Sequence, residues 1–294
     1  MTETPMGSRD DVLAGGGTGG TTSSPMAFPI PADELGSVSI VPNGSFEAGS
    51  YQTFVLTYVA GKFGIDDSGA MRVCFRFASD QTRPQFEDPK GPNYTTIEAS
   101  NNAVLTYHYD PKGNVRPWDR TLYIKVVRGF LREGDKITIT FGDRSGGSPG
   151  MRLQTFCEDS YEFHTLIDPI ATYCYQPMPV QPVIKIIPGE PARYLAVAPT
   201  IRAIDESFSV KFKGEDKWGN PSDQCDIQLY PRASHPVQNL PDVISLKPGE
   251  FFGVIDGLSV AKAADLHIDF LDDAGTVMCR TNPIRIEPAP ISRH

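Results

Sequence analysis

The sequence predicts an all-β protein built from two β-sandwich domains. Its 294 residues are enough for two ordinary domains, since one domain usually takes roughly 100–200 residues. Short runs in which apolar and polar residues alternate recur along the chain, and no run with the helical period exceeds a turn or two. The 27 glycines and 26 prolines supply turns between these runs. Many short strands separated by frequent turns are typical of β-sandwiches.

The N-terminal segment predicts a disordered tail over residues 1–35. Glycine, serine and threonine dominate it, and its residues follow neither the helical nor the strand period. It lacks the apolar core of a signal peptide, and no apolar run in the chain approaches membrane-spanning length. Five widely spaced cysteines without a Cys-x-x-Cys pair favour reduced thiols. We therefore expect a cytoplasmic protein that does not enter a membrane.

The N-terminal domain is expected over residues 36–178. Strands are predicted at 52–59, 70–77, 103–109, 121–127 and 136–140. In the second of these, Met71, Val73, Phe75 and Phe77 should share the core face, and Arg72, Cys74 and Arg76 should form a basic opposite face. The connection over residues 79–95 is long and irregular, so we expect it to be functional or to act as a packing flap.

The second domain is expected over residues 179–294, because a proline-rich stretch at 176–182 reads as a stiff linker. Seven further strands are predicted, at 183–187, 194–198, 207–213, 226–230, 251–255, 266–271 and 283–286. Seven short strands with turns between them are typical of an immunoglobulin-like sandwich.

A glycine-rich loop between two strands is the main candidate binding segment. It contains Asp143, Arg144, Ser145, Gly146, Gly147, Ser148, Gly150 and Arg152. Successive N–H groups in such a turn can form an anion-binding nest. The alternative is that the glycines only allow the positive φ angles of a long hairpin loop. The second candidate segment contains Arg116 and Trp118. The Trp118 ring could stack on a ligand or pack between the edges of the sandwich.

Other chemistries have weaker support in the sequence. Side chains two residues apart on a strand lie roughly 6.5–7 Å apart, so Asp265, His267 and Asp269 predict a solvated polar face and no metal site. Cys157 and His164 could form a thiol nucleophile and base, but the two acids after Cys157 would raise its pKa. A net charge of −9 and the absence of nucleotide-binding motifs argue against nucleic acid and anionic membranes as partners.

Several motifs together resemble the N-terminal half of large bacterial proteins, a family with no settled function. They span residues 61–67, 75–80, 109–118 and 141–152, and residues 216–221 and 282–285 resemble the immunoglobulin-like module that follows in those proteins. In that family the next segment opens a C-terminal half that resembles PHP-type metal-dependent hydrolases, beginning with Gly-Asp-Leu-His. This sequence ends at His294, where that half would begin, and Asp265-Leu266-His267 lacks the glycine.

The resemblance implies a non-catalytic accessory or substrate-entrance subunit that associates with a separately encoded metal-dependent hydrolase. We expect no cofactor in this chain, and a divalent metal would belong to the partner. The glycine loop, residues 87–90 and residues 116–120 would be the contact surfaces. Two alternatives stay open. One is a plain ligand-binding module. The other is a stand-alone hydrolase or lyase that acts on a small polar or aromatic substrate at the inter-domain cleft, with Asp143, Arg144, Cys157, Glu158 and His164 as its candidate residues.

Overall fold

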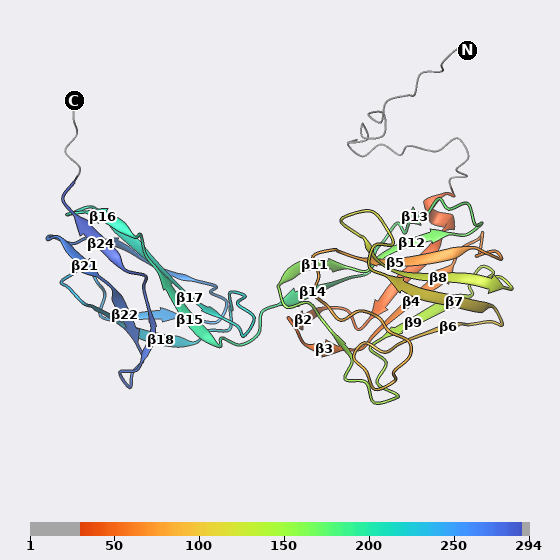
Figure 1. Cartoon of the computed structure of the whole chain (residues 1–294), viewed down its shortest axis with the longest axis horizontal. Coiled ribbons are helices and arrows are strands. Elements are labelled where there is room, and N and C mark those ends of the chain that lie inside the picture. The colour runs from red at the N-terminus through yellow and green to blue at the C-terminus, as the bar shows by residue number, and fades with distance from the viewer. Residues whose placement is uncertain (1–29, 290–294) are drawn as a thin grey trace, which may run out of the picture.

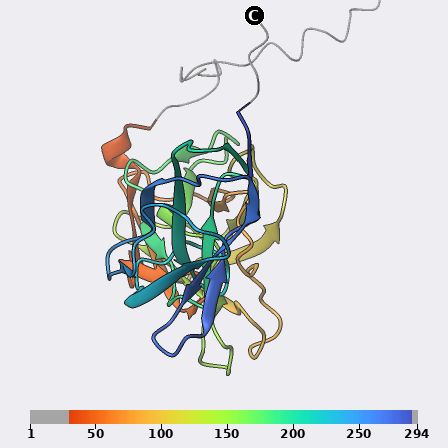
Figure 2. The same cartoon turned by 90° about the vertical axis from the view of Figure 1, so that its left-hand side faces the viewer.

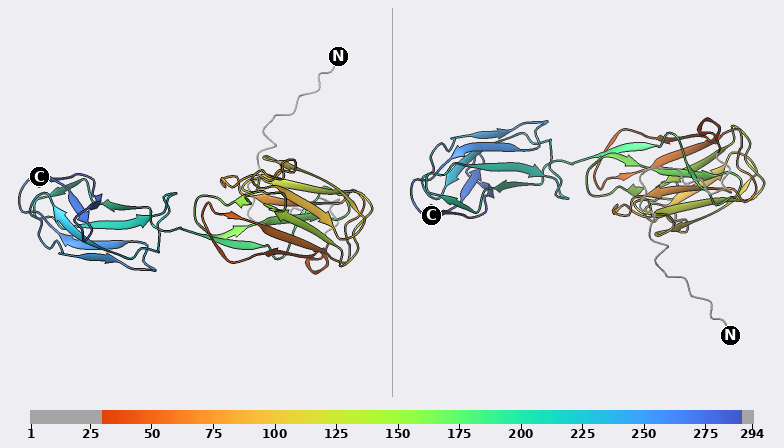
Figure 3. Two further views of the ribbon diagram at one scale, coloured as in Figure 1. Left: turned by 90° about the horizontal axis from the view of Figure 1, so that it is seen from below. Right: turned by 90° about the horizontal axis from the view of Figure 1, so that it is seen from above.

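The computed structural model describes residues 30–289, which form two β units lying end to end (Figures 1 and 3). The regular elements are strands, apart from one short 3-10 turn, η2 (Ala32–Glu34). Figure 2 views the molecule along its long axis, with the second unit in front of the first. The predicted all-β class with two sandwiches is therefore confirmed. The predicted tail lies outside the described residues over positions 1–29.

The first unit is a sandwich of two antiparallel sheets (Figure 1). One sheet has the order β1 (Gly36–Val41), β4 (Phe54–Ala60), β9 (Lys136–Phe141), β6 (Thr95–Ala99). The other has the order β13 (Gln176–Pro177), β12 (His164–Asp168), β5 (Ala70–Phe75), β8 (Arg120–Arg128), β7 (Val104–Asp110). Strands β6 and β7 are edge strands, each at the end of its own sheet.

The core of the first unit lies between these sheets because alternate side chains of each strand point inward. Every second residue of β4 is buried. Phe163 lies at the centre of an aromatic cluster, with its ring centroid 5.6 Å from Phe54, 5.6 Å from Phe75 and 5.7 Å from Phe141. All four rings are almost fully buried, and burying one such ring contributes roughly 1.5–3 kcal/mol.

Two expectations for β5 were wrong. Met71, Val73 and Phe75 are buried as expected, but the strand ends at Phe75, and Phe77 is 44% exposed in the turn that follows. The opposite face of β5 is covered and is not an open basic surface. Cys74 is fully buried there, and the guanidinium carbon of Arg72 lies 3.5 Å from the ring centroid of Tyr175. Sequence alternation assigned the faces of Met71 to Phe75 correctly but could not show that single side chains such as Tyr175 cover the outer face.

The first unit extends at both ends beyond the range expected from the sequence. A three-stranded sheet has the order β11 (Glu158–Glu162), β14 (Val183–Ile187), β2 (Ser45–Glu47), and β3 (Tyr51–Gln52) pairs with β10 (Met151–Arg152). Strand β14 was expected in the second domain, yet its Ile184 and Ile186 are buried in the core of the first unit. Ile30 and Leu35, expected in the tail, also belong to that core.

The second unit is immunoglobulin-like. One sheet has the order β15 (Arg193–Val197), β17 (Phe208–Glu215), β20 (Gly253–Leu258), and the facing sheet has the order β19 (Ile244–Leu246), β18 (Ile227–Ala233), β22 (Ile268–Leu271), β23 (Val277–Arg280). A third sheet has the order β16 (Ile201–Ala203), β24 (Ile284–Glu287), β21 (Ala264–Leu266). The rings of Phe212 and Phe270 stack 6.0 Å apart within the core of this unit.

Candidate binding surfaces

The glycine loop is an excursion between β9 and β10 whose backbone requires glycine. The hairpin considered from the sequence was wrong, because β9 pairs with β4 and β10 pairs with β3. Gly142 has a φ of +65°, and a Cβ there would lie 2.2 Å from the backbone nitrogen of Met151. Gly147 and Gly150 also have positive φ angles. A side chain at Gly142 would therefore be both strained and obstructed.

The charged side chains of the loop are bound within the first unit. The Asp143 carboxylate accepts hydrogen bonds from Ser145 N and from Thr96 Oγ1, each 2.9 Å long. The bond from the Ser145 backbone holds the pKa of Asp143 below its ordinary value, despite an opposing effect of burial. Arg144 Nη2 donates to the carbonyl oxygen of Tyr51 over 2.8 Å. Both charges thus fasten the loop to neighbouring strands.

The same loop packs against the connection over residues 79–95. Ser148 Oγ donates to Gly91 O over 2.7 Å, and Arg152 Nη2 donates to Asp80 O over 2.6 Å. A Cβ on Gly146 would lie 2.4 Å from the side chain of Pro89. We call residues 79–95 and 142–152 together the loop ridge. It forms the lower edge of the first unit in Figure 1.

Several N–H groups of the glycine loop already have acceptors inside the loop. Ser145 N donates to Asp143 Oδ1, Gly147 N donates to Arg144 O, and Gly150 N donates to Ser148 Oγ. These groups are therefore not free to form an anion nest. The arrangement favours a rigid structural loop over an anion site.

The second candidate segment is also held by internal contacts. The half-buried Trp118 ring stacks on His164, with centroids 4.8 Å apart and planes 14° apart. The Nδ1 atom of His164 lies 2.6 Å from Glu162 Oε1. The guanidinium carbon of Arg116 lies 4.8 Å from the ring centroid of Phe77. Trp118 thus packs against the sandwich, while Arg116 packs against Phe77.

The structure does not assemble the candidate catalytic residues into one site. Cys157 is exposed, but partial desolvation by its neighbours, reinforced by Asp216 and Asp159, raises its pKa to about 11, which disfavours a thiolate nucleophile at neutral pH. Within residues 30–289, no hydrogen bond joins Cys157 to His164. Glu158 is paired with Arg76 over 2.8 Å, and the other two candidates, Asp143 and Arg144, lie on the loop ridge. The raised pKa agrees with the expectation for Cys157, although partial desolvation is its largest cause.

Strand β21 and the strand after it carry ion pairs on their polar face. Among the described residues, no three His, Cys, Asp or Glu side chains converge in the manner of a metal site. Asp265 pairs with Arg285 over 3.3 Å, and Asp269 pairs with Arg280 over 2.5 Å. His267, which lies between the two strands, is 3.9 Å from Asp269. Oppositely charged partners thus surround the two carboxylates.

The turn over residues 216–221 is centred on a buried carboxylate. Asp216 is 2% exposed. Its Oδ1 accepts from Trp218 N and Asn220 N, each over 2.9 Å, and its Oδ2 accepts from Asn220 Nδ2 over 2.9 Å and from Gly189 N over 3.2 Å. Burial alone would raise the pKa of Asp216, but these hydrogen bonds outweigh it and lower the pKa.

The same turn also connects the two units, which sequence reasoning missed. Trp218 Nε1 donates to Ala48 O over 3.0 Å, and Asn220 Nδ2 donates to Thr155 O over 2.8 Å. Asn220 Oδ1 accepts from Cys157 N over 3.2 Å. A cavity of about 280 Å³ beside this junction is lined by both units and includes Cys157 and Glu158. The pairing of distant segments left no local signal in the sequence.

The outer face of the β15–β17–β20 sheet carries an apolar hollow of about 670 Å³. We call it the sheet hollow, and its lining residues are Leu195, Val197, Lys211, Phe212, Lys213, Pro221, Phe251 and Phe252. Val197 is 59% exposed and Phe252 is 60% exposed. The signal in the sequence is the alternation of β15, which turns the small Ala196 inward and leaves larger apolar residues outside.

Lys211 and Lys213 of β17 line the sheet hollow. Lys211 stands opposite Val197 on one neighbouring strand and opposite Val254 on the other. Lys213 lies 2.9 Å from the carboxylate of Glu215, whereas Lys211 is exposed and has no ion pair among the described residues. The hollow thus combines apolar side chains with an available positive charge.

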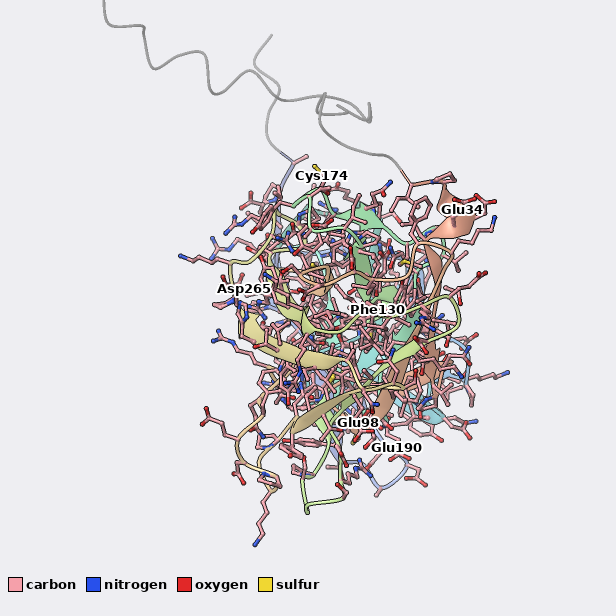
Figure 4. All side chains as sticks on the ribbon, turned by 90° about the vertical axis from the view of Figure 1, so that its right-hand side faces the viewer. Glu34, Glu98, Phe130, Cys174, Glu190 and Asp265 are labelled. Carbon is pink, nitrogen blue, oxygen red and sulfur yellow. The ribbon has the colours of Figure 1, made fainter. Side chains whose placement is uncertain are left out.

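A smaller apolar feature lies at the opposite end of the molecule. Figure 4 shows Phe130 near the middle of the end of the first unit that is turned away from the second. Its ring is 47% exposed, and the guanidinium carbon of Arg132 lies 5.1 Å from its centroid. A single exposed ring partly covered by its own neighbour is ordinary for a protein surface. The sheet hollow is the stronger candidate for a binding surface.

Comparison with known proteins leaves the function open. No family model and no curated protein matches the chain. Similar solved structures include the Yersinia pseudotuberculosis adhesin InvE, at 7% identity and a TM-score of 0.27, with 86% of this chain and 58% of that chain covered. A putative membrane-anchored protein from Corynebacterium diphtheriae has 10% identity and a TM-score of 0.27, with 87% of this chain and 54% of that chain covered.

A marsupial T cell receptor has 11% identity and a TM-score of 0.25, with 88% of this chain and 74% of that chain covered. The chain thus spans little more than half the length of the two bacterial proteins. Similarity at this level carries no information about function. No helix among residues 30–289 is long and apolar enough to cross a membrane.

Proposed function

We propose that this chain is a non-catalytic accessory protein that docks onto a separately encoded metal-dependent hydrolase subunit. The observation that carries the docking role is the sheet hollow, where Val197 and Phe252 are each more than half exposed on a folded unit. Contiguous exposed apolar surface of this kind marks interaction sites in soluble proteins. The choice of a hydrolase as partner rests on the sequence motifs that resemble the bacterial family.

The charge around the sheet hollow supports a partner surface that is apolar at its centre and acidic at its rim. Lys211 has no carboxylate partner among the described residues, and Lys213 shares Glu215 with Arg193. A complementary acidic surface would steer association and set its orientation. The whole chain has a net charge of −9, so a second copy would be repelled at long range. The electrostatics therefore favour a different protein over self-association.

The non-catalytic part of the proposal is supported by the site chemistry. Cys157 and Glu158 line the junction cavity, but a thiol with a pKa of about 11 is protonated at neutral pH. Glu158 forms an ion pair with Arg76, and the His164 ring stacks on Trp118. A stand-alone hydrolase or lyase at this cavity is thus the weaker candidate.

The test is a pull-down with the tagged chain from the cytoplasm of its source organism. We expect the unmodified protein to recover a metal-containing hydrolase and the double variant Val197→Ser, Phe252→Ser to lose it at least about tenfold, the equivalent of about 1.4 kcal/mol. Val277→Ser is the matched control, because Val277 is 48% exposed on β23, away from the hollow.

A second variant tests the surface expected from the sequence. Arg144→Ala combined with Arg152→Ala should leave recovery unchanged, provided that circular dichroism shows the fold intact, because both side chains bond within the first unit. Loss of the hydrolase in this variant alone would move the docking surface to the loop ridge. Recovery of no hydrolase by the unmodified protein would overturn the proposed function.

A further inference from the structure

A second hollow, of about 580 Å³, lies at the open edge of the first unit. We call it the edge hollow. One side is the edge strand β7, with Tyr107, His108 and Tyr109, and the other is the connection over residues 83–87. Its volume falls in the range of roughly 300–1,000 Å³ typical of small-molecule sites, which suits a ligand smaller than a protein surface. It lies in a different unit from the sheet hollow.

The walls of the edge hollow are aromatic. The rings of Phe86 and Tyr107 lie 4.8 Å apart with planes 56° apart, and Tyr109 completes the strand side. Tyr107 and Tyr109 pair in register with the buried Ile124 and Leu122, so they occupy the inward face of β7 at the edge of the sandwich. Flat rings at an open sandwich edge favour a planar, apolar ligand body.

The wall formed by the connection is held in place before any ligand binds. The side-chain oxygen of Gln85 accepts from the backbone nitrogens of Glu87 and Asp88, and its Nε2 donates to Asp88 O over 2.8 Å. Its backbone bonds to Asn93 and Thr95 tie the connection to the start of β6. A site that is already ordered loses little conformational entropy on binding.

The edge hollow carries one unpaired guanidinium, from Arg83, and one exposed carboxylate, from Glu87. Arg83 lines the hollow, is exposed, and makes no hydrogen bond or ion pair within the described part of the chain. Burial raises the pKa of Tyr109, the positive charges of Arg120 and Arg83 partly oppose this rise, and Asp119 and Asp110 add to it. Arg83 is thus one of several charges near the phenol. Glu87 is the one carboxylate among the lining residues. A free guanidinium presents a planar fork that suits a carboxylate.

We propose that the edge hollow binds a small aromatic carboxylate, with its ring packed against the Phe86–Tyr107 pair and its carboxylate on Arg83. This inference is independent of the proposed docking function, because it concerns another unit and another class of ligand. The chemistry is binding alone, with no bond made or broken. Aromatic packing and a charge-assisted hydrogen bond supply the affinity.

Benzoate is the probe, titrated into the full chain and followed by saturation-transfer NMR. Benzyl alcohol keeps the ring without the charge, and cyclohexanecarboxylate keeps the charge without the planar ring. We expect saturable benzoate binding in the millimolar range and clearly weaker binding of both comparators. Arg83→Gln should weaken benzoate about tenfold and leave benzyl alcohol unchanged, because a hydrogen bond between charged groups accounts for a change of that size.

Two further variants make the test decisive. Arg128→Gln is the matched control, since Arg128 is an exposed arginine at the end of β8 and outside the hollow. It should bind benzoate like the unmodified chain. Tyr107→Leu removes an aromatic wall that is 36% exposed, and should weaken benzoate and benzyl alcohol alike.

Three outcomes would overturn the proposal. The first is the absence of saturable benzoate binding, and the second is binding that Arg83→Gln leaves unchanged. The third is tighter binding of an acidic, phenylalanine-containing peptide than of benzoate, which would assign the hollow to a protein partner. Failure of the pull-down experiment would not affect any of these results.

Discussion

Replacing Asp216 by asparagine tests whether one buried carboxylate organises the junction turn. The carboxylate accepts four hydrogen bonds, two on each oxygen. Asparagine has nearly the same shape but only one acceptor oxygen, and its amide nitrogen is a donor. In either orientation, the amide nitrogen of asparagine replaces one carboxylate oxygen. The two N–H donors that bonded to that oxygen then face another donor.

The expected loss follows from these two donors. A buried donor left without an acceptor costs about 1–3 kcal/mol, and Asp216 is 2% exposed. Two such donors give an expected loss of about 3 kcal/mol for Asp216→Asn, with the longer bond from Gly189 N contributing least. The loss should appear in the second unit, whose turn contains the carboxylate.

Urea denaturation at pH 7 measures this loss through the fluorescence of Trp218. The chain has two tryptophans, so a Trp118→Phe background isolates the signal of the turn. Asp226→Asn is the matched control, because Asp226 is exposed. It should change the free energy of unfolding by less than about 0.5 kcal/mol. A change of the same small size in Asp216→Asn would refute the view that the carboxylate organises the turn.

The same variant predicts a dependence on pH. The pKa of Asp216 is lower in the folded chain than in the unfolded chain, where aspartate titrates near about 4. The carboxylate therefore contributes stability above pH about 4, and this contribution is lost as the pH falls through the folded pKa. The difference in unfolding free energy between the unmodified chain and Asp216→Asn should shrink below pH about 4. A difference that is constant from pH 7 to pH 3 would contradict this.

Two further predictions concern the thiol and the glycine loop. Cys157 is exposed, yet iodoacetamide should modify it about a hundredfold more slowly than free cysteine at pH 7, because partial desolvation and nearby carboxylates raise its pKa to about 11. Peptide mapping by mass spectrometry measures the rate, and a rate equal to that of free cysteine would exclude the raised pKa. Gly142→Ala should cost about 2 kcal/mol or more in thermal unfolding, because of its positive φ and the obstruction by Met151 N. Gly134→Ala, at φ +86° with open space around the Cβ, should cost only about 1 kcal/mol, and equal losses would show that the obstruction does not matter.

Local patterns in the sequence predicted much of the fold. Alternation placed Met71, Val73 and Phe75 on the core side of a strand, and all three are buried. The glycines at 142–150 predicted a loop with positive φ angles, which the backbone shows, but the expected hairpin is absent because β9 and β10 pair with different strands. The irregular connection over residues 79–95 was expected to be functional or to act as a packing flap, and it packs against that loop and lines the edge hollow.

The sequence missed features that depend on distant partners. Strand β14 lies beside β2 and β11, and only that pairing assigns it to the first unit. The charges of Arg144 and Arg152 were candidates for binding a partner, yet both bond to backbone carbonyls of the first unit. Whether a charged side chain is free or satisfied depends on the neighbours that folding brings to it.

The sequence by itself determined the approximate positions of many strands and turns, because a period of two and the glycine and proline positions act over a few residues. Only the tertiary structure decided which surfaces are available. The sheet hollow needs Val197 and Phe252 from separate strands and turns, the edge hollow needs Arg83 to lie beside Tyr107, and the junction needs Trp218 to reach Ala48. Burial and hydrogen-bond satisfaction are properties of neighbours in space, and neighbours far apart in the chain leave no local pattern.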